Sequence, residues 1–271
     1  MVKKSKEPKK KAVKKKVVKN AKKEIKEKTV KDVPRGLKTR FKVSPKKRIG
    51  RLPKLKKIRS RIAASIKIRK IRSKDVIIIL DFGSQYTQLI ARRIRENKVY
   101  SKIVPYNISI EEIREMKPKG IILSGGPLSV YDKNAPEPSR EIFKLDIPIL
   151  GVCYGMQVIN RIFGGKVQSS KEREFGRAEL FIDNNRDLFT NMPSNVTCWM
   201  SHSDEIKGLP KGFVKLAHTL NASVASFANR SKKIYGVQFH PEVVHTQRGT
   251  QILTNFMFHI CGCLPRWTMD K

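Results

Sequence analysis

The sequence predicts an α/β fold with a mostly parallel central sheet, helices on both of its faces and a smaller antiparallel β portion. Short runs of valine, isoleucine and leucine recur between residues 76 and 153, which is typical of strands buried on both faces. Segments with helical spacing separate these runs. More β-like segments with alternating side chains follow residue 165.

The first half of this region alternates strands and helices. Each apolar run is short enough for a strand, and each segment between them places its apolar residues three or four positions apart. The helix predicted first, for example, has Leu89, Ile90 and Ile94 on one face. The predicted strands are 76–80, 102–106, 120–126 and 147–153, and the predicted helices are 85–97, 110–116 and 154–165.

The second half is richer in strands and ends in a helix. The predicted strands are 178–182, 196–201, 213–218, 223–228 and 234–240, and the predicted helix is 250–260. In open sheets of this class, ligands bind outside the carboxyl ends of the strands. We therefore expect the chemistry at the residues that directly follow a strand.

Charge divides the chain at residue 74. Residues 1–74 hold 33 Lys and Arg against 4 Asp and Glu, a net charge of +29, which leaves 26 against 19, or +7, for residues 75–271. The lysine-rich part offers too little apolar surface to offset the entropy of ordering it, so we expect a disordered basic extension. It would be either a solvated tail or a segment that binds RNA or another polyanion unspecifically.

Targeting signals and cysteine pairs are missing from the sequence. No apolar signal core follows the charged start, and no apolar run approaches the roughly 20 residues that span a bilayer. We therefore expect a cytoplasmic protein without a membrane span. The cysteines fit neither a zinc site nor a disulfide framework, so no metal is predicted. They are Cys153, Cys198, Cys261 and Cys263.

Cys153 lies where an apolar strand gives way to a helix, with Gly151 two positions before it and Gly155 two positions after. Small residues at these positions permit a tight, strained turn that lifts a nucleophile out of the sheet. The unpaired N–H groups at the start of the helix favour a thiolate. We therefore expect an exposed, activated nucleophile, the alternative being a small buried apolar residue.

A candidate base follows the last predicted strand. His240 ends that strand, and Glu242 stands two residues later. A histidine there could hold Cys153 as thiolate and give a proton to a leaving group, while the carboxylate orients the ring. The alternatives are a buried histidine with structural partners and a surface carboxylate.

A third strand end carries Ser124-Gly125-Gly126-Pro127. Glycines let the backbone turn so that its N–H groups point at a developing oxyanion, and the N–H of Tyr154 would be a further donor. By itself the motif is also compatible with a plain turn. Together with a cysteine and a histidine at two other strand ends, it favours acyl transfer from a thiolate.

The segments LGVCYGMQ, ILSGGP and GVQFHPE, in this order and spacing, closely resemble class I glutamine amidotransferases over residues 75–263. The resemblance implies a flavodoxin-like α/β fold and a glutaminase that works through a glutamyl thioester. It also implies the roles of single residues. Cys153 would be the nucleophile, His240 the base and then the acid, Glu242 the orienting residue, Gly125, Gly126 and Tyr154 the oxyanion donors, and Gln157 a substrate contact.

Further segments resemble the GMP synthases within this family: DFGSQY at 81–86, SGGPLSVYD, KEREFGRAEL and MSHSDEI. By this resemblance Ser201, His202 and Ser203 line the glutamine pocket, and residues 264–271 begin a linker to a synthetase domain. The ammonia would then aminate XMP to GMP. ATP and magnesium are expected only in the synthetase partner, and no cofactor in this chain.

Two alternatives remain open at this point. The chain could be the glutaminase component of another synthetase, of the anthranilate or carbamoyl phosphate type, which shares the triad but not DFGSQY or MSHSDEI. It could instead be a polyanion-binding protein that carries a passive glutaminase fold. The presence of all three triad residues argues against the second alternative.

Overall fold

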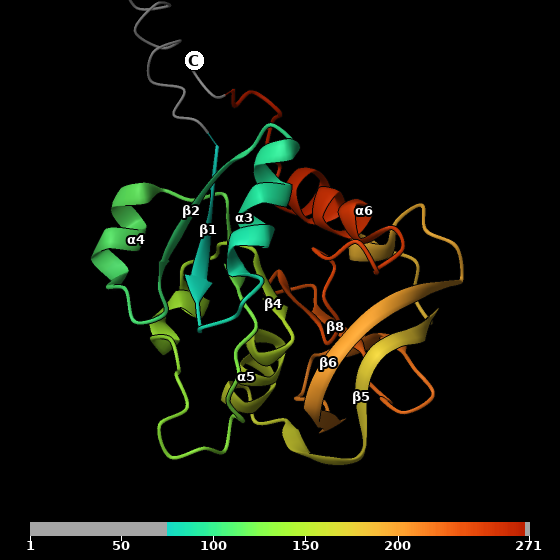
Figure 1. Cartoon of the computed structure of the whole chain (residues 1–271). Coiled ribbons are helices and arrows are strands. Elements are labelled where there is room, and N and C mark those ends of the chain that lie inside the picture. The colour runs from blue at the N-terminus through green and yellow to red at the C-terminus, as the bar shows by residue number, and fades with distance from the viewer. Residues whose placement is uncertain (1–74, 269–271) are drawn as a thin grey trace, which may run out of the picture. The chain divides into compact units, whose positions relative to one another are not determined.

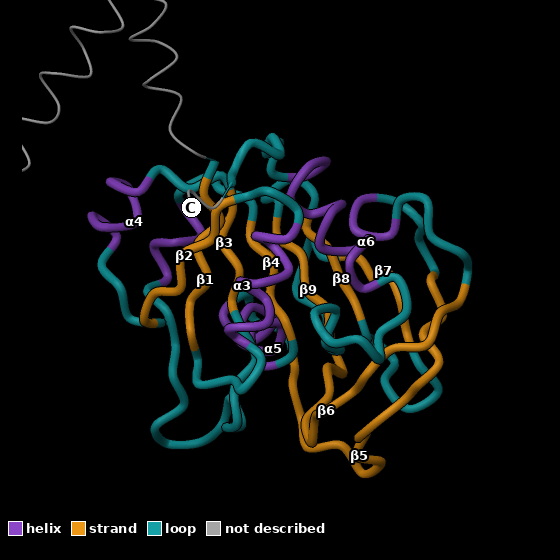
Figure 2. The backbone as a smooth tube through the Cα atoms, turned by 45° about the horizontal axis from the view of Figure 1, so that its top comes forward, coloured by secondary structure: helices purple, strands orange, loops and turns teal. Residues whose placement is uncertain are grey.

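The computed structural model describes residues 75–268, so the predictions for residues 1–74 lie outside the described residues. In this part of the chain, nine strands form one continuous sheet in the order β2-β1-β3-β4-β9-β8-β7-β5-β6. Figure 2 shows them side by side, from β2 at one edge to the β5 and β6 pair at the other. Parallel and antiparallel strands therefore share one sheet rather than forming separate layers.

The first five strands in this order all run parallel. They are β2 (Tyr100–Pro105), β1 (Val76–Asp81), β3 (Gly120–Leu123), β4 (Ile149–Val152) and β9 (Ile234–Val237). Because they are parallel, their carboxyl ends meet at one edge of the sheet. The ends of β3, β4 and β9 lie next to one another there, so the three predicted strand-end motifs are brought together.

The other four strands are antiparallel. They are β8 (Ser226–Asn229), β7 (Val214–His218), β5 (Lys166–Ile182) and β6 (Asn195–Gly208). The long ribbon of β5 and β6 stands out from the rest of the sheet in Figure 1. Its pairing is interrupted by an irregularity between Ser169 and Glu174.

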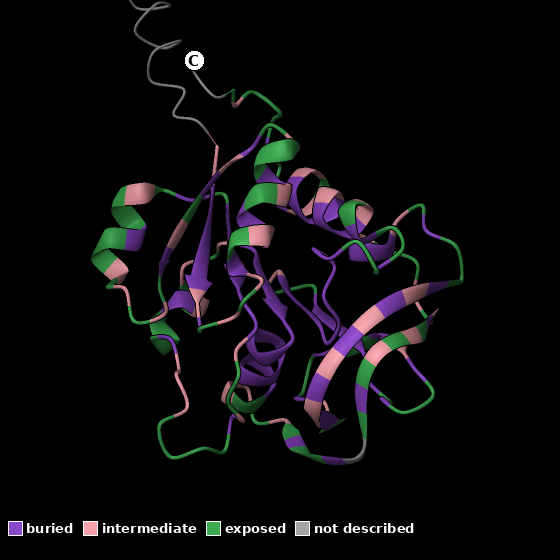
Figure 3. Cartoon of the chain, in the orientation of Figure 1, coloured by how far each residue is buried: buried purple, intermediate pink, exposed green. Residues whose placement is uncertain are grey.

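Helices cover both faces of the parallel strands. α3 (Thr87–Glu96) and α6 (Gly249–Thr254) contact each other on one face, while α4 (Ile110–Met116) and α5 (Tyr154–Ile162) belong to the other. Along β1, Ile77 and Ile79 join the core with α3 and α6, whereas Ile78 and Leu80 join the core with α4 and α5. All four side chains are fully buried, and Figure 3 shows the same burial along the inner strands. This explains the unbroken apolar runs.

The α/β fold class is confirmed, and the differences concern element lengths. β5 and β6 are much longer than the predicted strands 178–182 and 196–201, because the hairpin extends past the core into a region where polar residues alternate with buried ones. The predicted helix 250–260 is α-helical only over α6 and continues as a π-helix over Asn255–Ile260. Two short 3₁₀ helices, Arg140–Lys144 and Asp187–Phe189, were not predicted.

The end of the described chain packs against its start. The N–H of Leu264 donates to the Asp75 carboxylate at 2.8 Å, and the N–H of Trp267 donates to the carbonyl of Lys98 at 2.8 Å. These contacts lie at the amino ends of β1 and β2, opposite the strand-end motifs. Within the same residues, none of the helices has the length and apolar character that crossing a membrane requires.

Candidate active site

Cys153 occupies the turn between β4 and α5 in a strained conformation. Its φ of 51° and ψ of −109° are unusual for a residue with a side chain, and the turn is held by a bond of 2.8 Å from its N–H to the carbonyl of Val237. A Cβ on Gly151 would lie 2.6 Å from the Gly155 carbonyl, and one on Gly155 would lie 2.7 Å from the Leu123 Cβ. The two glycines are therefore required by close packing.

Cys153 is not exposed in the way the sequence suggested. Only 6% of its surface is accessible, because the elbow lies beneath the strand-end loops. Its sulfur instead borders two hollows, described below. The other cysteines differ: burial raises the pKa of Cys198 and Cys263 to about 12 and raises that of Cys261 as well, so these side chains remain neutral thiols.

His240 and Glu242 are brought together with Cys153 as predicted. The Nδ1 of His240 lies 2.8 Å from Oε1 of Glu242, and both side chains are buried. Burial lowers the pKa of His240, whereas the hydrogen bonds with Cys153 and Glu242 and the negative charge of Glu242 raise it. The raising effects are larger, so the pKa lies well above its usual value. At neutral pH the ring therefore carries a proton that it can donate.

The backbone of His240 is fixed on both sides. Its N–H donates to the carbonyl of Trp199 at 3.0 Å, and its carbonyl accepts a bond of 2.6 Å from the Thr246 hydroxyl. The ring of Tyr86 stands edge-on to the imidazole, with 5.0 Å between the ring centres. Arg93 donates to the carbonyl of Glu242 at 3.0 Å. The ring is thus positioned by α3, by β6 and by the loop that follows β1.

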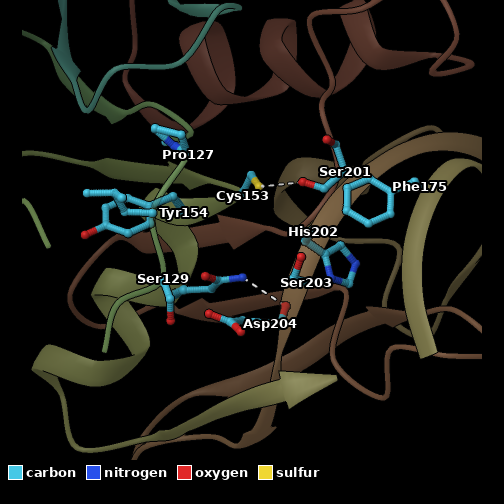
Figure 4. Close-up of a pocket in the computed structure, with 12 residues that line it drawn as sticks. Pro127, Ser129, Cys153, Tyr154, Phe175, Ser201, His202, Ser203 and Asp204 are labelled. Atoms are coloured by element: carbon cyan, nitrogen blue, oxygen red, sulfur yellow. Dashed lines mark hydrogen bonds between the residues drawn. The ribbon is translucent and has the colours of Figure 1, made fainter. Parts of the chain in front are cut away.

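Two further groups contact the sulfur of Cys153. The carbonyl of Ser201 on β6 lies 3.6 Å from it, and Nε2 of Gln238 lies 3.8 Å from it. Figure 4 shows the contact with Ser201. The nucleophile is therefore held between the end of β4, the end of β9 and the long strand β6. The last of these belongs to the antiparallel half of the sheet.

Backbone N–H groups near the sulfur are available for an oxyanion. In the first turn of α5, Gly155 donates to Ser124, and Met156 and Gln157 donate to the carbonyl of Cys153. Within residues 75–268 the N–H of Tyr154 has no such acceptor, nor do those of Gly125 and Gly126. The three predicted donors thus lie at the ends of β3 and β4, on either side of the elbow.

The first hollow has a volume of about 430 Å³ and lies between the elbow and β6. We call it the inner hollow. Gln157, Ser203 and Asp204 line it together with Cys153 and Ser201. The remaining lining residues are Gly126, Pro127, Leu128, Ser129, Tyr154, Phe175 and His202. Its walls therefore include four of the predicted substrate contacts, Gln157, Ser201, His202 and Ser203.

Two of these contacts are partly engaged by the protein itself. The Nε2 of Gln157 donates to the carbonyl of Asp204 at 3.0 Å and lies 3.2 Å from Oε1 of Gln238. The ring of His202 pairs with the buried Glu174 through Nε2 at 3.2 Å, and Glu174 also accepts from Thr219 at 2.9 Å. The amide nitrogen of Gln157 and the ring of His202 are therefore held by the protein, which leaves the side-chain oxygen of Gln157 for a ligand.

A second hollow of about 470 Å³ adjoins the same sulfur. We call it the outer hollow. It shares Cys153, Gly126, Pro127 and Ser201 with the inner hollow, and it alone includes His240. Its other lining residues are Gly83, Ser84, Gln85 and Tyr86. Among residues 75–268, the side chains of His, Cys, Asp and Glu form no cluster of three or more suited to a metal ion.

Sequence reasoning missed several neighbours of the triad. Gln238 directly follows β9, two residues before His240, and the period of two along the predicted strand 234–240 could have placed both on one side. Tyr86 and Phe175 carried no such signal, since both meet the site only through tertiary contacts. Thr246 and Arg93 likewise act on the triad through hydrogen bonds to backbone carbonyls, which the sequence does not encode locally.

Comparison with known families gives one match that covers most of the described region. Residues 78–260 match the family described as glutamine amidotransferase class-I. A solved structure from Thermoplasma acidophilum, described as a candidate component of GMP synthase, is 33% identical, with a TM-score of 0.63 over 70% of this chain and 96% of that one. A glutamine amidotransferase from Thermotoga maritima, at 18% identity and a TM-score of 0.52, supports the fold alone.

Two curated relatives carry the same description. The chain is 54% identical over 203 residues to "GMP synthase [glutamine-hydrolyzing]" of Rippkaea orientalis, which covers 75% of this chain and 38% of the relative. It is 56% identical over 198 residues to the protein of the same name in Gloeothece citriformis, which covers 73% of this chain and 36% of the relative. The chain thus spans well under half the length of these relatives.

Proposed function

Because this chain belongs to the class I glutamine amidotransferases, we propose that it hydrolyses glutamine to glutamate and ammonia through Cys153, His240 and Glu242. One observation carries the proposal. The strained elbow presents a sulfur that lines the same hollow as His240, and Nδ1 of His240 lies 2.8 Å from Glu242. This is the arrangement of nucleophile, base and orienting carboxylate that acyl transfer requires.

In the first half of the proposed reaction, the Cys153 thiolate attacks the side-chain carbonyl carbon of glutamine. The negative charge that develops on the oxygen is accepted by the N–H groups of Tyr154 and Gly126, with Gly125 beside them. His240 gives its proton to the amide nitrogen as the carbon–nitrogen bond breaks. Ammonia leaves, and a glutamyl thioester remains on the sulfur.

In the second half, water attacks the thioester carbonyl. His240, now neutral, accepts a proton from that water, and the carbon–sulfur bond breaks so that the thiolate of Cys153 returns. Glu242 keeps the ring oriented in both halves and balances its positive charge. Gln157, Ser201, His202 and Ser203 would hold the amino-acid end of the substrate in the inner hollow.

The destination of the ammonia follows from the relatives. We propose that this chain supplies ammonia to an ATP-dependent synthetase portion that aminates XMP to GMP. The shared name of relatives at 54% and 56% identity supports this choice. We also propose that residues 75–263 form the glutaminase unit, and that residues 264–271 begin the connection toward a synthetase. ATP and magnesium would be bound only by that portion.

A direct test measures glutamate and ammonia released from glutamine by the whole chain and by Cys153→Ala. We expect release from the parent and none above background from the variant. Equal release from both would reject the proposed chemistry.

The destination of the ammonia is tested by adding synthetase portions of the GMP, anthranilate and carbamoyl phosphate types with their acceptors. Stimulation by the GMP type with XMP and ATP is expected, and stimulation by another type alone would reject that destination.

The net charge of +29 on residues 1–74 favours a second, separate activity. We propose that these residues attract RNA and other polyanions without sequence preference, because clustered lysine and arginine release counterions from any phosphate backbone. This attraction would be independent of Cys153.

A further inference from the structure

The two hollows that meet at Cys153 offer different chemical groups. The inner hollow contains Gln157, Ser203 and Asp204, which can bind the charged and polar groups of an amino acid. The outer hollow contains His240 and is lined otherwise by the loop at residues 83–86. Both hollows therefore border the sulfur, and His240, the residue that transfers protons in the proposed reaction, lines only the outer one of the two.

The proposed reaction uses His240 twice, first to protonate the departing nitrogen and then to accept a proton from water. Each transfer needs the two heavy atoms within roughly 3 Å of each other. Ammonia must therefore leave, and water must arrive, on the side of the sulfur where His240 lies. The amino-acid end of the substrate must occupy the opposite side, since it stays bound through both steps.

We propose that the outer hollow is the acceptor side of the site, through which ammonia leaves and a small neutral nucleophile enters to resolve the thioester. This inference rests on the proposed function and adds a role to residues 83–86. Water is the ordinary nucleophile, and amines of similar size belong to the same chemical class. Exposed Gly83 and Gln85 lie at the mouth of the hollow, while half-buried Ser84 and Tyr86 lie deeper.

Tyr86 limits the size of what can enter. Its ring stands 5.0 Å from the imidazole of His240, and its N–H donates to the Ser84 hydroxyl at 3.1 Å. The loop itself is fixed by Asp81, which accepts bonds from the Gly83 N–H at 3.0 Å and the Thr87 hydroxyl at 2.8 Å. Because Asp81 fixes the loop at residues 83–86, the ring of Tyr86 determines the space beside His240.

Gly125 lies close to two residues that line the outer hollow, His240 and Ser84. A Cβ there would lie 3.3 Å from Cε1 of His240 and 3.3 Å from the Ser84 hydroxyl. A side chain at this position would therefore crowd the space between the imidazole and Ser84.

An amine can replace water with the same balance of atoms. The nitrogen of hydroxylamine attacks the thioester carbonyl carbon, and His240 accepts one of its protons. The carbon–sulfur bond breaks with its electron pair on the sulfur, which restores the thiolate and gives γ-glutamyl hydroxamate. N-methylhydroxylamine reacts in the same way but carries one extra methyl group, so the two amines measure the width of the acceptor side.

The experiment incubates the whole chain with glutamine and each amine, and measures hydroxamate against glutamate. The ratio of products does not depend on the amount of active enzyme. We expect Tyr86→Ala to raise the yield from N-methylhydroxylamine relative to hydroxylamine by about tenfold, the usual worth of one methyl group in a tight pocket. Tyr86→Trp should lower the yield from N-methylhydroxylamine relative to that from hydroxylamine. This variant provides the test if Tyr86→Ala does not fold.

Two controls separate this effect from general damage. Tyr100→Ala removes an aromatic ring at the start of β2, beside Trp267, and should leave the product ratio unchanged. Ser203→Ala, in the inner hollow, should raise KM for glutamine without altering the preference between the amines. A preference unchanged in both Tyr86 variants, or altered equally by Ser203→Ala, would overturn the assignment of the two sides.

The two proposals fail in distinguishable ways. If the parent chain forms neither glutamate nor hydroxamate, both the proposed glutaminase chemistry and the proposed role of the outer hollow are rejected. If both products form but substitution of Tyr86 leaves their ratio unchanged, the glutaminase proposal stands and only the role of the outer hollow is rejected.

Discussion

At the scale of residues, the four cysteines of the described chain differ in their surroundings. Cys198, Cys261 and Cys263 are buried among apolar groups, where their pKa values rise. Cys153 instead lies beside a histidine whose pKa is raised by its interactions with Cys153 itself and with the buried carboxylate of Glu242. Four cysteines of the same chemistry thus divide into three inert thiols and one candidate nucleophile.

Substitutions within the triad should differ in severity. Cys153→Ala and His240→Ala are expected to reduce glutamine hydrolysis by several orders of magnitude, because each removes a group that forms or breaks a bond. Glu242→Ala should be less damaging by roughly a hundredfold, since the carboxylate only orients the ring and stabilises its charge. Steady-state release of glutamate measures all three. A Glu242 variant as inactive as the Cys153 variant would contradict this ranking.

The pH dependence should report the link between His240 and Glu242. The negative charge of Glu242 favours the imidazolium and raises the pKa of His240, so replacing it by Gln should lower that pKa. The protonated ring, needed as an acid, is then lost at lower pH. We expect the alkaline limb of kcat/KM to move to lower pH by about 1–3 pH units in Glu242→Gln. A shift to higher pH would show that the carboxylate does not stabilise the imidazolium.

At the scale of elements, the decisive unit is the connection from β4 to α5. Gly151 and Gly155 pack face to face, and Gly155 also packs against Leu123 on β3. The elbow is thereby pressed onto the neighbouring strand, so the position of the sulfur depends on the contact between two strands and one helix. Its positive φ is retained because these contacts and the bond from Cys153 to Val237 fix the turn.

This packing leads to a stability prediction. Gly155→Ala would place a Cβ 2.7 Å from the Cβ of Leu123, which forces the helix away from β3. We expect unfolding to become easier by about 1–3 kcal/mol, the usual cost of overpacking a core. Chemical denaturation measures it. The control is Gly208→Ala at the end of β6, where a Cβ would meet Lys166 at an ordinary 3.5 Å. Equal stabilities of the two variants would contradict the packing argument.

At the scale of the whole molecule, the sheet joins two halves with different tasks. The parallel strands supply Cys153, His240 and the glycine donors at their carboxyl ends. The antiparallel strand β6 supplies Ser201, Ser203 and Asp204, so it forms the opposite wall of the inner hollow. β9 pairs with β8, and β7, β5 and β6 follow in the same sheet, so hydrogen-bonded strands connect the two walls.

Removal of residues 1–74 should separate the two proposed activities. These residues carry a net charge of +29, while the residues that the structure describes around the two hollows lie between 83 and 240. We expect the shortened chain to hydrolyse glutamine at the rate of the full chain and to lose its binding to RNA. Binding by the full chain should weaken steeply as salt rises, because it depends on counterion release. Filter binding over a salt series and a glutaminase assay measure the two properties.

Retained, salt-sensitive RNA binding after this removal would place the polyanion site elsewhere. A loss of glutaminase activity without unfolding would show that the basic residues contribute to the reaction. Filter binding and the glutaminase assay, applied to the full chain and the shortened chain, distinguish these outcomes.

The order of residues alone was enough to predict the strands of the parallel half and the residues at their ends. Runs such as Val76–Asp81 must be buried on both faces, and glycines flanking Cys153 permit only a tight turn. These are local properties, written into the order of side chains along a few residues. They were sufficient to predict the fold class and to select Cys153, His240 and Glu242.

The surroundings of those residues emerge only in the folded chain. The length of the β5–β6 hairpin, the pairing of His202 with Glu174 and the approach of Tyr86 to His240 all join residues far apart in the chain. The local periodicity of apolar residues does not predict such contacts, because each contact depends on how the whole sheet twists and packs. The two hollows that meet at the sulfur are likewise formed by residues from distant parts of the chain, so they exist only once it has folded.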